Sequence, residues 1–176
     1  MYELFLLGKL MDRPWYGYEF HQVLNAFVGP MRQVSWGTIY PMLRRLENEG
    51  LIKPASGGSA QADKRGRQRY AITSAGKRAF RERMHPESLN DANYRDTFRV
   101  MLGNFSRVDS ASRHSIVSGY LERLAAVIAH AERMAARVRS VPELKQTERD
   151  DILIALERDR ALAEADCKWI HEKGLG

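Results

Sequence analysis

The chain has 176 residues, of which 44% are hydrophobic and 28% charged, and its formal net charge is +6. This composition is typical of one or two packed domains and excludes a disordered chain. The longest apolar run lies within residues 1–11 and has no basic segment before it, so we expect neither a signal peptide nor a membrane span. The single cysteine, Cys167, excludes an internal disulfide and a cysteine-based zinc site, and a reducing cytoplasm is the expected compartment.

The charge is distributed unevenly along the chain. Residues 1–84 carry fourteen Lys and Arg against seven Asp and Glu, a net charge of +7, whereas residues 85–176 carry fourteen against fifteen, a net charge of −1. This asymmetry indicates a basic binding module beside a near-neutral companion, and a nucleic acid suits such a module. We therefore predict two domains, residues 1–84 and residues 85–176.

Three helices are predicted in the first fifty residues. Residues 2–11 form a helix whose apolar side chains cover more than one stripe, so we expect a second face packed against another element or another chain. Residues 13–17 read as a turn, and residues 18–27 resume a helical period.

The third helix begins near Ser35, a candidate N-cap, and Gly50 supplies its stop. Pro41 lies six residues after Ser35, where it would remove one hydrogen bond inside the helix. If the regular helix begins near Thr38 instead, Pro41 falls in the first turn and the missing N–H costs nothing. The sequence leaves both arrangements open.

A basic hairpin is predicted directly after this helix. Residues 51–55 and 67–73 read as strands on either side of a glycine-rich polar loop. Arg67 and Arg69 are expected on one side of the second strand, with Tyr70 and Ile72 on the other. Ser74 could then cap a fourth helix that extends to Met84.

The C-terminal half is helical in pattern. A shorter helix is predicted within residues 90–105, and two long helices over residues 109–140 and 147–173 carry a heptad seam. Joined through Pro142, the long helices predict an antiparallel hairpin that would leave apolar surface in water, so we expect a second copy to cover it. Arg160 lies in the seam and needs an acidic partner, a route to water or an anionic ligand.

The order of helix, helix, amphipathic helix, basic hairpin and helix is that of a winged helix-turn-helix domain. Three separated segments, GYEF at 17–20, VSWGTIYPMLRRLENEGLI at 34–52 and GRQRYAITSAGKRAF at 66–80, resemble in order and spacing the PadR-like transcriptional regulators. The helical remainder resembles the C-terminal dimerisation region of the longer members by pattern. The chain departs from the family at Trp36, where a small residue or proline is common, and in its loop at 56–66.

The resemblance implies a mainly α fold with a small β-hairpin wing: an N-terminal winged helix-turn-helix followed by a helical, coiled-coil-like dimerisation domain. It also implies a homodimeric, sequence-specific regulator of transcription, most often a repressor, whose partner is double-stranded DNA with a pseudo-palindromic operator. Many family members release DNA when a small aromatic compound binds, but this sequence identifies no effector. Four side chains could line a cavity for one, although core packing explains them equally well: Trp15, Phe98, Met101 and Trp169.

On this interpretation the third helix enters the major groove, with its N-terminal part nearest the base edges. The expected DNA contacts are Thr38, Tyr40 and Arg44 to bases; Arg45, Lys64, Arg65, Arg67 and Arg69 to phosphates or the minor groove; and Ser35 and Tyr18 as phosphate donors. Each has a structural alternative, since surface arginines are usually solvated and the tyrosines could belong to the core. Trp36 is expected to pack beside the start of the helix.

In the family, the C-terminal helix packs against the partner's N-terminal helix. The side chains expected at such an interface are Leu4, Leu7, Val117, Leu121, Leu124, Ile128, Leu153, Leu156 and Ile170.

Two other classes of function fit the sequence less well. The five histidines show no metal-ligand spacing and no nucleophile elbow or phosphate-binding loop occurs, so we expect neither an enzyme nor a bound cofactor or metal. The second alternative is a non-specific nucleic-acid-binding protein or a protein-interaction adaptor that has kept the fold. The motifs for a recognition helix and a wing argue against it.

Overall fold

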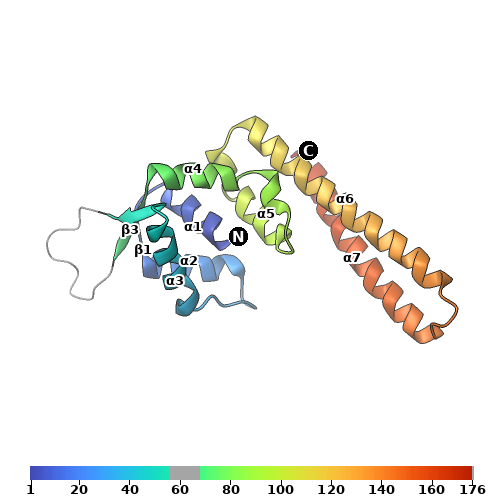
Figure 1. Ribbon diagram of the computed structural model, residues 1–176. Coiled ribbons are helices and arrows are strands. Elements are labelled where there is room, and N and C mark those ends of the chain that lie inside the picture. The colour runs from blue at the N-terminus through green and yellow to red at the C-terminus, as the bar shows by residue number, and fades with distance from the viewer. Residues whose placement is uncertain (56–67, 176) are drawn as a thin grey trace. The chain divides into compact units, whose positions relative to one another are not determined.

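The computed structural model describes residues 1–55 and 68–175 (Figure 1). Contacts divide the chain into two compact units. The N-terminal unit comprises Met1–His85 and Arg99–Val108, and the C-terminal unit comprises Pro86–Phe98 and Asp109–Gly176. The domain boundary expected between residues 84 and 85 stays a prediction.

Four helices form most of the N-terminal unit: α1 (Tyr2–Leu10), α2 (Gly17–Val28), α3 (Trp36–Asn48) and α4 (Ser74–Arg83). Helix α1 is the central one, since it contacts α2, α4 and strand β3 (Arg69–Ile72). Leu6 and Leu7 on α1 are completely buried. Elements of the same chain therefore cover the second apolar face of α1.

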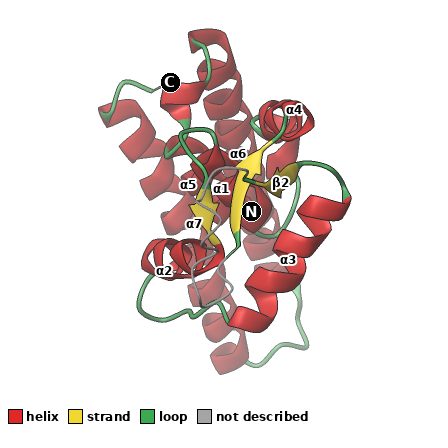
Figure 2. Ribbon diagram, turned by 90° about the vertical axis from the view of Figure 1, so that its left-hand side faces the viewer, coloured by secondary structure: helices red, strands yellow, loops and turns green. Residues whose placement is uncertain are grey.

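A three-stranded antiparallel sheet accompanies these helices (Figure 2). Its order is β1 (Trp15–Tyr16), β3 and β2 (Ile52–Pro54), with Trp15 opposite Tyr70 and Ile52 opposite Ile72. The sequence prediction of a two-stranded hairpin was therefore wrong in one respect, because it placed β1 in a turn. A strand of two residues is too short to show the alternation by which strands are recognised.

Pro41 lies inside α3. The helix begins at Trp36, and the N–H groups of Thr38 and Ile39 both donate to the carbonyl of Ser35, so its first turn is already hydrogen-bonded. The late start near Thr38 is excluded. Pro41 lacks the N–H that would reach the Gly37 carbonyl, but both residues are exposed, so water can satisfy that oxygen.

Helix α3 ends in a Schellman motif. Gly50 adopts a φ of 70°, and the N–H of Leu51 donates to the Leu46 carbonyl at 2.9 Å. Thr73, rather than the predicted Ser74, caps α4, and its hydroxyl oxygen accepts from the Gly76 N–H at 3.0 Å. The Thr73 hydroxyl also donates to the Gly50 carbonyl at 2.7 Å, which joins the start of α4 to the end of α3.

The C-terminal unit is built on a hairpin of α6 (Ser110–Ser140) and α7 (Gln146–Glu172) (Figure 1). A short 3₁₀ helix, Pro86–Leu89, packs on α6, and α5 (Tyr94–Leu102) begins in this unit. A second 3₁₀ helix, Phe105–Arg107, belongs to the N-terminal unit. The predicted order of helices, hairpin and long helices is thus observed, and the chain is mainly α with a small sheet.

The seam between α6 and α7 contains Arg160, the charged residue that was predicted to lie in it. Arg160 lies 3.8 Å from Oε1 of Glu132 on α6 and 3.4 Å from Oε1 of Glu164 on its own helix. Of the three alternatives, an acidic partner and a route to water are both present, since the Arg160 side chain is 44% exposed. Burial raises the pKa of the nearby Cys167 thiol, and the charges of Asp166 and Glu164 raise it further, which disfavours the reactive thiolate.

A hydrogen-bonded tyrosine joins α6 to α7. The Tyr120 hydroxyl donates to Oδ2 of Asp166 at 2.8 Å, and the Phe98 ring stacks on Tyr120 with centroids 3.8 Å apart. Burial and the bond to Asp166 raise the pKa of Tyr120 far above its ordinary value. The phenol therefore remains a donor at neutral pH.

Several side chains expected at a dimer interface are already buried within one chain. The exposed fraction is 3% or less for Leu4, Leu7, Val117, Leu124 and Ile170. Four others are half-buried: Leu121, Ile128, Leu153 and Leu156. The buried five have almost no area left for a second subunit, because they fill the chain's own core; their role as dimer contacts stays a prediction.

Candidate nucleic-acid interface

Helix α3 has one buried face and one open face. Ile39, Leu43 and Leu46 are completely buried in the N-terminal unit. Trp36, Tyr40 and Arg44 are exposed and follow one another at intervals of four residues, which places them on one ridge of the helix. The predicted base contacts Tyr40 and Arg44 are thus open to solvent, as an insertion into a DNA groove requires, and so is Thr38.

Trp36 stands between two other rings. Its centroid lies 3.8 Å from that of His21 on α2, with the planes 6° apart, and 5.5 Å from that of Tyr40, with the planes 22° apart. The indole packs beside the start of α3, as the sequence led us to expect. It nevertheless remains 43% exposed, so packing does not account for all of its surface.

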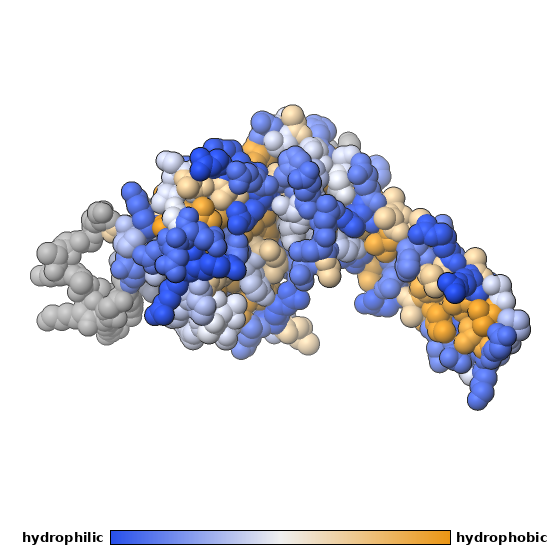
Figure 3. Space-filling view, in the orientation of Figure 1, coloured by the Kyte–Doolittle hydropathy of each residue, from blue (hydrophilic) through white to orange (hydrophobic). Residues whose placement is uncertain are grey.

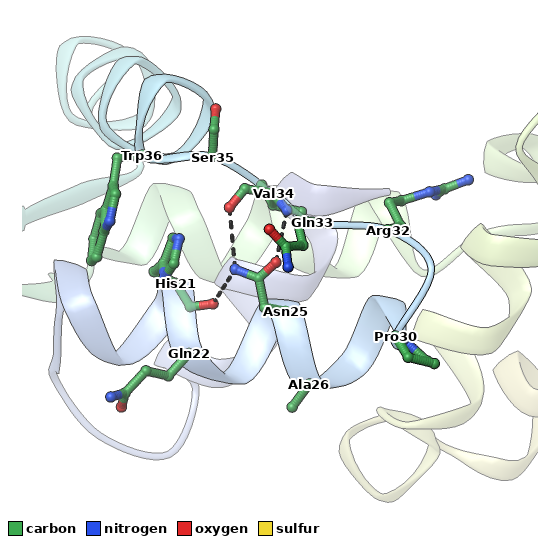
Figure 4. Close-up of a pocket in the computed structure, with 11 residues that line it drawn as sticks. His21, Gln22, Asn25, Ala26, Pro30, Arg32, Gln33, Val34, Ser35 and Trp36 are labelled. Carbon is green, nitrogen blue, oxygen red and sulfur yellow. Dashed lines mark hydrogen bonds between the residues drawn. The ribbon is translucent and has the colours of Figure 1, made fainter.

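The loop that leads into α3 is held by Asn25 (Figure 4). The Asn25 side-chain oxygen accepts from the Val34 N–H at 2.7 Å, and its Nδ2 donates to the Val34 carbonyl at 3.1 Å. The same Nδ2 donates to the His21 carbonyl at 2.9 Å. Three hydrogen bonds from one amide therefore determine where α3 begins relative to α2.

An open pocket of about 940 Å³ adjoins this loop. Its wall combines the His21 and Trp36 rings with amide and guanidinium groups, and Figure 4 shows these side chains around the loop. The lining residues are His21, Gln22, Asn25, Ala26, Gly29, Pro30, Arg32, Gln33, Val34, Ser35 and Trp36. Ser35 is the N-cap of α3 by position, but its hydroxyl lies 3.3 Å from that of Thr38 and does not cap the helix.

Arg45 already has carboxylate partners. It pairs with Glu3 of α1 and lies 3.8 Å from Oε1 of Glu49, and the other oxygen of Glu3 lies 3.1 Å from Arg83. A DNA phosphate would have to compete with Glu3 for Arg45. The phosphate contact expected of Arg45 stays a prediction. Arg44 differs from Arg45, because no carboxylate in the described part of the chain lies within ion-pair distance of it.

The side chains predicted on the wing are only partly placed. Lys64, Arg65 and Arg67 lie outside the described residues. Arg69 is half-buried on the sheet, where its guanidinium lies over the Tyr16 ring at 5.1 Å and donates to the Pro14 carbonyl at 3.4 Å. Tyr18, a predicted phosphate donor, is half-buried with its ring stacked on Tyr16 at 5.6 Å.

An acidic side chain organises the beginning of α2. Glu19 accepts from the Tyr16 N–H at 2.7 Å and pairs with Arg13 at 2.8 Å. Its partial burial favours the neutral acid, but the hydrogen bonds from Arg13 and Tyr16 and the charges of Arg13 and Arg69 outweigh burial and lower the pKa of Glu19. This carboxylate therefore stays ionised at neutral pH.

Sequence reasoning missed three parts of the site. His21, Asn25 and Glu3 were not among the predicted residues, yet they stack on Trp36, hold the Val34 loop and pair with Arg45. A helix-loop-helix spacing could have suggested Asn25, since amides often bond to nearby backbone. Nothing local in the sequence links Glu3 to Arg45, which lies 42 positions later.

The side chains considered for an effector cavity are packed against neighbours or exposed. Trp15 stacks on Phe20, Phe98 stacks on Tyr120, Met101 is completely buried and Trp169 is 41% exposed. Among residues 1–55 and 68–175, no group of three or more His, Cys, Asp or Glu is arranged to hold a metal ion. In the same residues, no helix has both the length and the hydropathy needed to cross a membrane.

Comparison with known proteins finds a family model that matches the N-terminal part of the chain. The model of the transcriptional regulator PadR-like family matches residues 6–82, which begin within α1, end within α4 and include α2, α3 and the sheet. No curated protein matches the chain.

Solved structures give a more distant likeness. Bacillus subtilis PadR in complex with operator DNA is 18% identical, over 98% of this chain and 95% of that one, with a TM-score of 0.40. The PadR-like transcriptional regulator BC1756 from Bacillus cereus is 22% identical, over 98% of this chain and 99% of that one, with a TM-score of 0.36. The smu.1604c protein of Streptococcus mutans is 21% identical, over 99% and 98% of the two chains, with a TM-score of 0.40.

Proposed function

We propose that the protein is a sequence-specific DNA-binding regulator, because residues 6–82 match the model of the PadR-like family of transcriptional regulators. The observation that carries the proposal is the open ridge of α3. Its side chains stand opposite a completely buried face of the same helix, in a half of the chain whose net charge is +7. This arrangement suits a recognition helix in the major groove of double-stranded DNA.

We propose that Arg44 reads a base and that the wing arginines supply affinity. A guanidinium can donate two parallel hydrogen bonds to guanine, whereas a cation that contacts a phosphate binds without regard to sequence. Selection of bound DNA from a random pool tests the proposal directly. A single enriched motif is expected, and equal binding of all sequences would instead indicate the non-specific alternative.

Two substitutions separate base reading from phosphate binding. Arg44→Ala should relax the preference at one position of the motif, by about 1 to 3 kcal/mol of discrimination. Arg67→Ala should weaken binding to all sequences alike and reduce the slope of log affinity against log salt by about one. Titration of labelled duplexes at several salt concentrations measures both, and an unchanged motif with Arg44→Ala would exclude Arg44 as a base contact.

The proposed regulator is a homodimer that binds a pseudo-palindromic operator and acts as a repressor. Support comes from an apolar stripe on α7, where Ile154, Leu162 and Trp169 are exposed by 66%, 38% and 41%. At 100° per residue these three side chains fall within an arc of roughly 80°, opposite Ala163 and Ile170, which are completely buried. Figure 3 shows hydrophobic surface on the α6–α7 hairpin near the end where the helices are joined.

The dimer predicts an operator with two half-sites. Recognition helices of a twofold dimer meet the major groove about one helical turn apart, roughly 34 Å. The selected motif should therefore be an inverted repeat. A reporter gene placed behind that motif tests repression, and compounds that restore its expression would identify an effector.

A further inference from the structure

We propose that Trp36 reads thymine, through contact of its partly exposed indole ring with the C5-methyl group in the major groove. The inference deepens the proposed function and rests on it. It assigns a specificity-determining role to a residue at which the chain departs from the pattern of the family that it resembles.

The first support is the position of Trp36 on α3. It is the first residue of the helix, and it begins the ridge that continues through Tyr40 and Arg44. The N-terminal residues of a recognition helix lie nearest the base edges. A side chain at this position therefore contacts bases if the ridge enters the groove.

The second support is the way the indole is held. Both the His21 ring, at 3.8 Å, and the Tyr40 ring, at 5.5 Å, stack on it, yet 43% of Trp36 is exposed. Figure 4 shows the parallel rings of His21 and Trp36 at the start of α3. A ring held by its neighbours loses little conformational freedom when DNA binds. Little of the free energy of its contact with DNA is therefore offset by lost side-chain entropy.

The third support is chemical. An indole ring is apolar apart from one N–H group, and the thymine methyl is the one apolar group that the base pairs present in the major groove. Arg44 lies eight positions after Trp36, about 12 Å along the helix, so both side chains can reach bases of one half-site. We therefore expect the thymine in the same half-site as the guanine read by Arg44.

The test uses the full chain and the motif obtained by selection. Each thymine of one half-site is replaced in turn by uracil, which lacks only the methyl group. The wild-type protein should lose about fourfold in affinity at one position, the factor expected for one buried methyl group. Trp36→Ala should bind the thymine and uracil forms of that position equally, while keeping the preference for guanine attributed to Arg44.

Control variants separate contact from folding. Trp36→Phe keeps an aromatic edge and should retain part of the difference between thymine and uracil. Gln22→Ala changes an exposed neighbour on α2 and should retain all of it. Thermal unfolding of each variant shows whether the N-terminal unit is intact, and Trp36→Phe remains informative if Trp36→Ala unfolds.

Three outcomes would overturn the inference. Wild-type protein could bind thymine and uracil forms alike at every position, or Trp36→Ala could keep the wild-type ratio. Trp36→Ala could instead weaken all sequences equally, which would mean that the indole N–H binds a phosphate. Failure to select any motif would be a different result, because it would overturn the proposed function itself.

Discussion

At the scale of the residue, Asn25 is the side chain on which the position of α3 depends. Its three hydrogen bonds reach the backbone of Val34 and His21, and no other side chain in the described part of the chain bonds to the backbone of Val34. We predict that Asn25→Ala lowers the free energy of unfolding by about 2 kcal/mol, since each net hydrogen bond contributes about 1 kcal/mol and water can reach part of the site. It should also weaken operator binding.

Chemical denaturation and a DNA titration measure the two effects. Ala26, the exposed neighbour of Asn25 on α2, provides the control, because Ala26→Ser should lower stability by only about 0.5 kcal/mol and leave operator binding unchanged. Equal stability of Asn25→Ala and the wild type would show that the loop is held by other contacts.

Single residues differed in how far the sequence could predict them. The sequence left Arg160 three alternatives in an apolar seam: an acidic partner, a route to water or an anionic ligand. In the structure its side chain has carboxylate neighbours and is also 44% exposed. The identity of the partner did not follow, since Glu132 belongs to a different helix. The ion pair of Arg45 with Glu3 could not be predicted from the sequence either, because only the packing of α1 against other elements brings these side chains together.

At the scale of the element, the junction of α3, β2 and α4 depends on Gly76. A Cβ atom at this position would lie 2.0 Å from the Leu51 carbonyl oxygen and 2.7 Å from Cγ1 of Ile72. The carbonyl belongs to backbone held by the Schellman turn and by the Thr73 hydroxyl, so it cannot move freely. We predict that Gly76→Ala destabilises the N-terminal unit by about 3 kcal/mol, at the upper end for overpacking.

Gly37 provides a matched control for Gly76. A Cβ there would meet only the Ser35 hydroxyl oxygen, at 3.5 Å, and Gly37 lies in the first turn of α3. Gly37→Ala should therefore raise stability by about 0.5 to 1 kcal/mol. The two melting curves should move in opposite directions, and a Gly76→Ala variant as stable as the wild type would contradict the packing assigned to Gly76.

Elements were predicted well where they are long. The apolar spacing of α6 and α7 repeats over many turns. The predicted start of α6 and both predicted ends of α7 differ from the observed ones by one residue, and the predicted end of α6 is identical to the observed one. Strand β1 has two residues, and its existence depends on pairing with β3, more than fifty positions away. A local pattern contains no information about such a pairing.

At the scale of the whole molecule, the proposed dimer makes a prediction about mass. The wild type should sediment at micromolar concentration with twice the mass of the chain. Leu162→Glu combined with Trp169→Glu should give a monomer, because two carboxylates would have to be buried in an apolar contact. The monomer should also lose affinity for a two-half-site operator.

Ala136→Glu, at an exposed position of α6, is the control and should remain dimeric. A wild-type monomer at micromolar concentration would refute the dimer. Dimers of the double variant would place the interface elsewhere than on the α7 stripe.

Local sequence patterns were enough to predict the α-helices, the order of helix, hairpin and helix, the segregation of positive charge and the three motifs that carry the family resemblance. These features depend on residues that are close neighbours in the chain, so periodicity, capping and turn chemistry are enough to predict them. The tertiary structure decided which apolar side chains are left exposed, such as Trp36 and Trp169, and which charges are paired, such as Arg45 with Glu3. Exposure and pairing arise from contacts between segments far apart in the sequence, and only the packed chain specifies those contacts.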